Sequence, residues 1–265
     1  MGEERIPIKR AFLWVFLSVV AISGTATFGW LYYLHWKETL QVNPKYALTV
    51  IAQTAPQGQQ LDQSFFAEVL GLSQDEPMNL YALSKKEAER RLGEHPLIKT
   101  AAVSQLPPQT LHIDYEMRIP VAFLGDFVNV ALDEEGIMIP FRPFFTPKRL
   151  PKITFGLTET VTWGNPLPDA RYSLALQLIE AFRKEGIEVK SLDLSRMEAS
   201  SYGNREIVAI VEEPDHRAPR ILRLNHKRPF ASLEDYLRYR SQYGDESFLT
   251  IDLRIKDLAF LNLSK

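Results

Sequence analysis

The hydrophobic pattern begins with one long uncharged stretch near the start of the chain. Residues 11–34 (AFLWVFLSVVAISGTATFGWLYYL) contain no Asp, Glu, Lys or Arg. As an α-helix, this stretch would be about 36 Å long, which is enough to cross a hydrocarbon core of about 30 Å. The pattern therefore predicts a transmembrane helix at residues 11–34, surrounded by membrane lipid.

The charges that flank this stretch predict its orientation. Arg5, Lys9 and Arg10 precede it, whereas only Lys37 follows it closely. Because positively charged flanks stay in the cytoplasm, we expect residues 1–10 to be a cytoplasmic tail. The protein is then a single-pass, type II protein of the cell (inner) membrane, and the bulk of the chain is extracytoplasmic.

A cleaved signal peptide is the competing interpretation of the same stretch. Gly24 and Ala26 could supply the small residues of a cleavage site. However, the apolar sequence continues to Leu34, where a signal peptide would already have become polar. The pattern therefore favours an uncleaved anchor, followed by a linker at residues 35–45.

The next segment, residues 46–118, predicts a small domain with the order strand, helix, helix, strand, strand. The first strand is expected at residues 46–51. Asp62 has the position of an N-cap and Gly71 that of a helix end, with Phe65, Val69 and Leu70 as the buried stripe. The second helix starts with a capping box formed by Ser84 and Glu87 and stops at Gly93 and Pro96.

Two strands complete this predicted domain, at residues 98–105 and 110–116. The second alternates strictly, so Leu111, Ile113 and Tyr115 should face the core. The polar residues His112, Asp114 and Glu116 share its other face and could in principle hold a divalent metal. Alternation alone explains their positions, so we assign no metal there.

Residues 119–265 predict a second, strand-rich domain. Gly136 closes a turn sequence (residues 133–136) between two apolar strands, which indicates a hairpin, and prolines at 140, 143, 147 and 151 indicate a surface loop. A helix is expected at 169–186, with Tyr172, Ala175, Leu176, Ile179 and Phe182 on one stripe, and a second helix should run from an N-cap at Ser232 to about Tyr243. The strands are expected at 121–124, 127–132, 137–139, 189–194, 206–211, 220–224, 248–255 and 258–263.

The predicted fold class is therefore α+β. It comprises a single N-terminal transmembrane helix, a small βααββ domain, and a mainly antiparallel β-sheet domain with packed helices. On the penultimate strand Leu249, Ile251, Leu253 and Ile255 should share one face. The last strand is a plausible sheet edge with apolar side chains, and it either is covered within the fold or accepts a partner strand. Its apolar residues are Leu258, Ala259, Phe260, Leu261 and Leu263.

Composition removes several classes of function. Lys and Arg number 31 against 33 Asp and Glu, for a net charge of -2, so the chain lacks the basic excess of general nucleic-acid binders. It has no cysteine, which excludes disulfides, thiolate metal sites and cysteine nucleophiles. The common nucleophile-elbow, phosphate-loop and zinc-protease motifs do not occur in the sequence. We therefore predict that the protein is not an enzyme and has no cofactor.

A local basic cluster follows residue 215. We interpret it as a solvated loop and strand face rather than a lipid-binding or acidic-partner-binding surface, because no aromatic residues interleave with it. The cluster consists of Arg217, Arg220, Arg223, Lys227 and Arg228, with His216 and His226.

Several segments resemble the FtsQ/DivIB family of bacterial division proteins. The small domain resembles that family's POTRA module, although the acidic residue near its Arg-x-Pro corner lies one place earlier, at Glu116. Residues 150–153 (LPKI) and the Asp252-Leu253-Arg254 triplet resemble two further landmarks of the family. The segments that carry the POTRA resemblance are 83–88 (LSKKEA), 95–99 (HPLIK), 106–107 (LP), 110–113 (TLHI) and 118–122 (RIPVA).

The resemblance implies a non-catalytic scaffold of the division complex that helps control septal peptidoglycan synthesis. Its POTRA-like domain would contact other division-complex proteins, and its C-terminal domain would bind FtsB-like and FtsL-like bitopic proteins. The positions carried over as partner-binding are Asp252 and Arg254, together with the apolar residues of the last strand.

Two other classes of function stay open. A membrane-anchored cell-wall hydrolase would need a cleft with paired carboxylates, and the sequence offers no persuasive pair. A POTRA-bearing adaptor of protein export would share the anchor and the small domain. Division or secretion genes in the neighbourhood would separate the first and third hypotheses.

Overall fold

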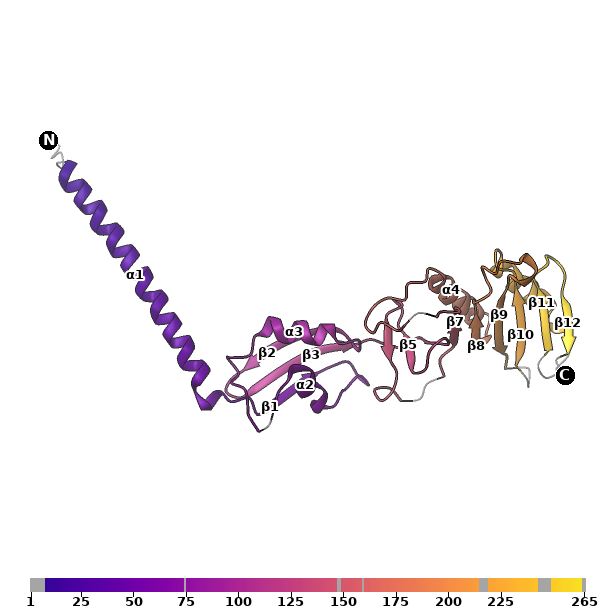
Figure 1. Ribbon diagram of the computed structural model, residues 1–265, viewed down its shortest axis with the longest axis horizontal. Helices are drawn as coiled ribbons and strands as arrows, with labels where there is room; N and C mark the ends of the chain where they lie inside the picture. The colour runs from indigo at the N-terminus through magenta and orange to yellow at the C-terminus, as the bar shows by residue number, and fades with distance from the viewer. Residues whose placement is uncertain are drawn as a thin grey trace. The chain divides into compact units, whose positions relative to one another are not determined.

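The computed structural model describes residues 8–73, 75–146, 149–158, 160–214, 219–242 and 249–263. The chain forms two compact units, one containing Met1–Leu92 and Ala101–Tyr115, and the other containing Gly93–Thr100 and Glu116–Lys265. The first unit holds an apolar helix and most of a small sheet, and the second holds a larger mixed sheet, so the fold is α+β (Figure 1).

The apolar helix α1 spans Ile8–Val42 and is longer than the sequence pattern predicts. Its part from Phe12 onward is long and apolar enough to cross a membrane. Residues 35–42, expected as linker, continue the helix because they contain neither glycine nor proline. The helix ends at Asn43-Pro44, where proline disfavours helical geometry in the residue before it, and the 3-10 turn Pro44–Tyr46 follows.

The small domain has the predicted order of elements. Its three strands form a sheet in the order β1-β3-β2, and β1 runs parallel to β3. The first strand starts at Val50 rather than at the predicted Tyr46, because the 3-10 turn occupies the residues before it. The elements are β1 Val50–Thr54, α2 Gln63–Leu70, α3 Lys85–Glu94, β2 Ile98–Leu106 and β3 Thr110–Met117.

The core of this domain confirms the strand pattern and corrects the helix pattern. Leu111, Ile113 and Tyr115 of β3 are buried, as predicted. On α2 the buried residues are Phe66 and Leu70, whereas Phe65 and Val69 are only half-buried. The apolar positions of this eight-residue helix cover more than one face, so spacing alone did not identify the inner one.

Local capping signals were read correctly at α2 and in part at α3. The Asp62 carboxylate accepts a hydrogen bond from the Ser64 N–H, and Gly71 ends α2 in the left-handed conformation. At α3 the Ser84 hydroxyl accepts from the Glu87 N–H. The Glu87 carboxylate, however, binds arginine side chains one turn later, so this capping box is only half formed.

The second unit contains a nine-stranded sheet in the order β12-β11-β10-β9-β8-β7-β4-β5-β6. The pairs β10–β11, β7–β8 and β4–β7 are parallel and the other five described pairs are antiparallel, so the sheet is mixed, with more antiparallel than parallel pairs. The strands are β4 Ala122–Leu124, β5 Val130–Leu132, β6 Met138–Pro140, β7 Lys152–Thr154, β8 Glu188–Asp193, β9 Ile207–Glu212, β10 Arg220–Leu224, β11 Leu249–Leu253 and β12 Phe260–Leu263.

The β5–β6 hairpin confirms the predicted turn. Gly136 adopts φ 79°, and a Cβ there would lie 3.0 Å from the Tyr172 ring, so both the backbone and the packing require glycine. The Asp133 carboxylate accepts hydrogen bonds from the N–H groups of Glu135 and Ile137. Of the expected proline-rich loop, Pro147 lies outside the described residues.

Helices α4 (Arg171–Lys184) and α5 (Pro229–Tyr239) pack against this sheet and share its core. Leu178 of α4 is fully buried, whereas Leu176 and Ile179, expected on the buried stripe, are half-buried. Ser232 is not an N-cap, because α5 begins three residues earlier, at Pro229. The Ser232 hydroxyl instead donates to the Leu253 carbonyl and so ties α5 to β11.

Candidate partner-binding edge

The last strand, β12, forms one edge of the nine-stranded sheet (Figure 1). It pairs antiparallel with β11, placing Phe260 opposite Asp252 and Leu261 opposite Ile251. Among the residues that the structure describes, no strand pairs with the other side of β12. The backbone N–H and C=O groups on that side are therefore available to another strand.

Apolar, exposed side chains lie along this edge, together with the exposed polar side chain of Asn262. Leu258, Phe260 and Leu261 are 52%, 55% and 53% exposed, respectively. Ala259 packs partly against the core, and the Leu263 side chain lies outside the described part of the chain. Natural sheets protect their edges with charge, proline or a covering segment, and the apolar side chains described on β12 provide no such charge.

A tight turn connects β11 to β12. Ile255, predicted to share one face with Leu249, Ile251 and Leu253, lies beyond the end of β11 and is exposed. The Leu258 N–H donates to the Ile255 carbonyl, and Asp257 adopts φ 59°. A positive φ at a non-glycine residue is uncommon, and aspartate tolerates it better than most residues. The chain therefore reverses tightly here and returns as β12.

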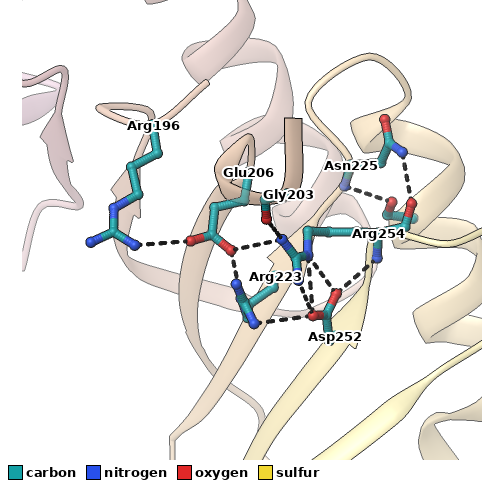
Figure 2. A network of polar contacts seen from close by, with 8 residues as sticks. Arg196, Gly203, Glu206, Arg223, Asn225, Asp252 and Arg254 are labelled. Carbon is teal, nitrogen blue, oxygen red and sulfur yellow. Dashed lines mark hydrogen bonds and ion pairs between the residues drawn. The ribbon is translucent and has the colours of Figure 1, made fainter. Parts of the chain in front are cut away.

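Asp252 and Arg254, the two charged residues proposed from the sequence, bind each other. The Arg254 guanidinium donates from Nε to Asp252 Oδ1 at 2.9 Å and from Nη2 to Oδ2 at 2.7 Å (Figure 2). The Arg254 backbone N–H also donates to Oδ1. This paired geometry is among the stronger ion-pair arrangements in proteins.

Two residues from distant parts of the sequence complete the network. Arg223 on β10 donates from Nε to Glu206 at 2.5 Å and from Nη1 to Asp252 at 3.1 Å. The Glu206 carboxylate, whose residue is only 3% exposed, also lies 3.8 Å from Arg254 and 3.5 Å from Arg196 (Figure 2). A buried carboxylate surrounded by arginines avoids the large cost of an unpaired charge.

This network fixes the protonation state of Asp252. Burial alone would raise the pKa of its carboxyl, but the hydrogen bonds and charge of Arg254, together with the charge of Arg223, lower that pKa below its usual value. The hydrogen bond to Asp252 in turn raises the pKa of Arg254. Asp252 therefore remains ionised at neutral pH.

The network connects elements instead of presenting free charges. Arg254 Nη1 donates to the Gly203 carbonyl in the 3-10 turn Tyr202–Asn204, and the Asn225 side chain donates to the Arg254 carbonyl. The Asp252 side chain is only 16% exposed. Asp252 and Arg254 thus hold β10, β11 and this turn together. They stabilise β11, the strand with which β12 pairs.

Sequence reasoning missed Glu206 and assigned Arg223 to a different role. Glu206 precedes Asp252 by 46 positions, as follows from their numbers, and no short motif links them. The one available signal is an acidic residue placed directly before the apolar strand Ile207–Glu212, where a solvated position would have been the simpler expectation. Only the pairing of β9, β10 and β11 brings these side chains together.

The basic cluster expected on one solvated face is divided among several environments. Arg220 is buried, its Nη1 donates to the Tyr236 hydroxyl, and it lies 3.7 Å from Glu213. Lys227 is exposed and lies over the Tyr202 ring. Arg223 belongs to the Asp252 network, and His216 and Arg217 lie outside the described residues.

Two other places in the structure carry acidic or metal-ligating side chains that were predicted from the sequence or line a pocket. His112 Nε2 lies 2.9 Å from the Thr54 hydroxyl, and the part of the chain that the structure describes gathers no group of three metal-ligating side chains. A pocket of about 820 Å³ beside α4 contains Glu134, Glu180 and Glu188 among its lining residues. Glu180 and Glu188 form ion pairs with Arg183 and Lys190, respectively.

Comparison with known proteins adds no relative to this picture. No family model matches the chain, and a search of curated proteins also finds no match.

Proposed function

We propose that this protein is a single-pass membrane scaffold of the bacterial division complex, similar to FtsQ/DivIB, and that β12 is its partner-binding edge. The observation that carries the proposal is an open sheet edge with apolar, exposed side chains at Phe260 and Leu261. Such an edge is costly to leave in water and can accept an extended segment of another protein.

Strand addition explains how the edge could bind tightly and selectively. Backbone hydrogen bonds to β12 would supply affinity, and alternate side chains of the added strand would supply specificity. On one side of the sheet the added strand would meet Leu261, and on the other it would meet Phe260. FtsB-like and FtsL-like bitopic proteins are the proposed partners, since the resemblance assigns them to this domain.

The remaining parts of the chain fit the same proposal. The helix α1 would anchor the protein with its N-terminus in the cytoplasm, because Arg5, Lys9 and Arg10 precede it. The small domain with the order strand, helix, helix, strand, strand would be the POTRA-like module that contacts other division-complex proteins. Both sheets would then be extracytoplasmic.

A pull-down with the full chain in detergent tests the proposal directly. FtsB-type and FtsL-type partners should bind the wild-type protein, and Phe260→Glu should weaken binding by at least about tenfold, because a charge would enter an apolar contact. Val128→Glu is the matched control, since Val128 is 94% exposed and lies beside β5, away from β12. Undiminished binding of the Phe260 variant would contradict the proposed edge.

A further inference from the structure

The end of α1 is attached to the small domain by the side chain of Asn79, from the loop that precedes α3. The last carbonyls of a helix have no partner within the helix and must find one elsewhere. Asn79 Nδ2 donates to the Leu40 carbonyl at 3.1 Å and to the Asn43 carbonyl at 3.0 Å. One amide from the loop before α3 therefore caps the C-terminal end of the apolar helix.

Asn79 is itself held in place, so this cap is rigid. The Tyr81 N–H donates to Asn79 Oδ1 at 2.8 Å, which uses the acceptor of the same amide whose donors bind α1. Ala47 and Asn79 also form an isolated β-bridge. All the hydrogen-bonding groups of this one side chain are thus engaged, some with the helix end and some with the small domain.

Further contacts surround the cap. Gln41 Nε2 donates to the Tyr81 carbonyl, and the rings of Tyr46 and Tyr81 meet edge to face with centroids 4.9 Å apart. The Leu80 N–H donates to the Tyr46 carbonyl at 2.7 Å. Leu40 and Gln41 are half-buried, whereas residues 12–39 of α1 are exposed. Among these residues, the helix is therefore covered by other parts of the chain only where it meets the small domain.

The helix carries no interruption that would allow it to bend before this junction. Between Gly29 and Pro44 the sequence contains neither glycine nor proline. Sharp kinks occur almost always at proline, at glycine or serine pairs, or at bulges in the helix. The last turns of α1 should therefore be as stiff as the apolar part before them.

We infer that α1 and the small domain move as one rigid body, so that a change in tilt or rotation of the helix is transmitted to that domain through the Asn79 cap. This goes beyond the proposed scaffold function, because partner binding at β12 would require only a flexible tether. It rests on that proposal solely in placing α1 within a membrane. The expected linker at residues 35–45 is thus a coupling element.

Distance measurements between two spin labels test this inference in the full chain in phospholipid nanodiscs. The sequence has no cysteine, so labels attached at Glu38→Cys and Lys86→Cys have no background. Both positions are exposed, one on α1 and one on α3. The distance distribution should be narrow in the wild-type background and at least about twofold broader when three glycines are inserted after Val42.

The variant Asn79→Asp isolates the cap. It has nearly the same shape and keeps the acceptor for the Tyr81 N–H, but it loses the donors to Leu40 and Asn43 and places a negative charge beside their carbonyls. Its distribution should broaden to the width of the glycine insertion. A label pair at Glu68→Cys and Lys86→Cys, both within the small domain, should stay narrow and show that this domain is intact.

Two results would overturn the inference. The first is a wild-type distribution as broad as that of the glycine insertion, which would show a flexible tether. The second is an Asn79→Asp distribution as narrow as wild type, which would show that the cap does not couple the two parts. If Asn79→Asp broadens the distance distribution of the control pair, this variant no longer isolates the cap. The comparison between the wild-type and glycine-insertion distributions then still tests whether α1 and the small domain move together. Loss of partner binding at β12 would change neither outcome.

Discussion

The two edge strands of the nine-stranded sheet, β6 and β12, differ in whether another segment of the chain covers their outer side. At β6, the Met138 N–H donates to the Asn165 carbonyl at 3.0 Å, and the Gly164 N–H donates to the Met138 carbonyl at 2.9 Å. Ile137 and Pro166 form a further bridge. A loop of the same unit thus covers that edge, whereas β12 is open among the described residues and carries exposed apolar side chains.

The two edges should therefore affect different properties of the protein: the covered edge its folding stability, and the open edge its binding of a partner. Both edges have the same problem of unpaired backbone groups, because every strand has two sides. The covered edge satisfies these groups within the chain, so changes there should alter the free energy of unfolding. Among the described residues, no strand pairs with the outer side of the open edge, so changes there should alter partner affinity and leave the free energy of unfolding almost unchanged.

The largest effect should be seen in hydrogen exchange of the full chain with and without an FtsB-type partner. If the partner adds a strand, outward amides of Phe260–Leu263 should become protected by at least about tenfold, because they enter new hydrogen bonds. The amides of Met138 and Ile139 should not change, since the edge formed by β6 is already covered. Binding without added protection of β12 would show that side chains alone form the contact.

The covering loop can be weakened at Gly164. This residue adopts φ 74°, and a Cβ there would meet nothing closer than Pro96 at 3.6 Å, so Gly164→Ala adds backbone strain without a clash. We expect the free energy of unfolding to fall by about 1–2 kcal/mol. Thermal unfolding measures this loss, and partner affinity serves as the control that should stay constant. A weakened affinity would show that the two edges are not independent.

The network behind β12 should respond to pH. Because the folded-state pKa of Asp252 is lowered, its ionised form stabilises the fold above its usual pKa of 3.8, and this contribution disappears as the pH falls through the folded value. Asp252→Asn should therefore lower stability by about 1 kcal/mol at pH 7. The difference in stability between the two proteins should begin to shrink below about pH 4 and disappear once the pH lies below the folded-state pKa of Asp252. A constant difference at every pH would contradict the charged role of Asp252.

The smallest effect is expected at Ile255. The alternating pattern predicted that Ile255 shares one face with Ile251 and Leu253, but the residue lies beyond β11 and is exposed. Ile255→Ser should therefore change the free energy of unfolding by less than about 0.5 kcal/mol. Ile251→Ser is the comparison variant, because Ile251 lies within β11, is fully buried and should cost several times more. Equal losses would contradict the exposed position of Ile255.

Local sequence patterns predicted most helices and strands of this chain, and the predictions that were wrong have physical causes. Asp62 and Gly71 were read correctly because a cap depends only on neighbouring backbone groups. Ser232 was misread because a serine before an apolar stripe resembles a cap, whereas its hydroxyl binds β11. Leu176 and Ile179 have the helical spacing of core residues, but they pack only at the margin of the core and line the pocket beside α4, so they are half-buried.

The sequence predicted the open edge only as one of two alternatives, the other being a last strand that is covered within the fold. Apolar residues at 258–261 indicate a strand at the end of the chain, but they do not say whether another segment lies beside it. The covering of β6 by residues 164–166 was not foreseen, since no periodic pattern marks those three residues. Edge coverage is a contact between distant segments and therefore depends on the complete topology.

By itself, the sequence determined the uncharged helix, the order of strands and helices, and the inward faces of strands such as β3, because these depend on spacing between near neighbours. The tertiary structure alone decided which strands meet, and with them the mixed sheet, the Glu206–Arg223–Asp252 network and the open side of β12. It also decided that Asn79 caps α1, since a helix end can be satisfied by any polar group that folding brings near.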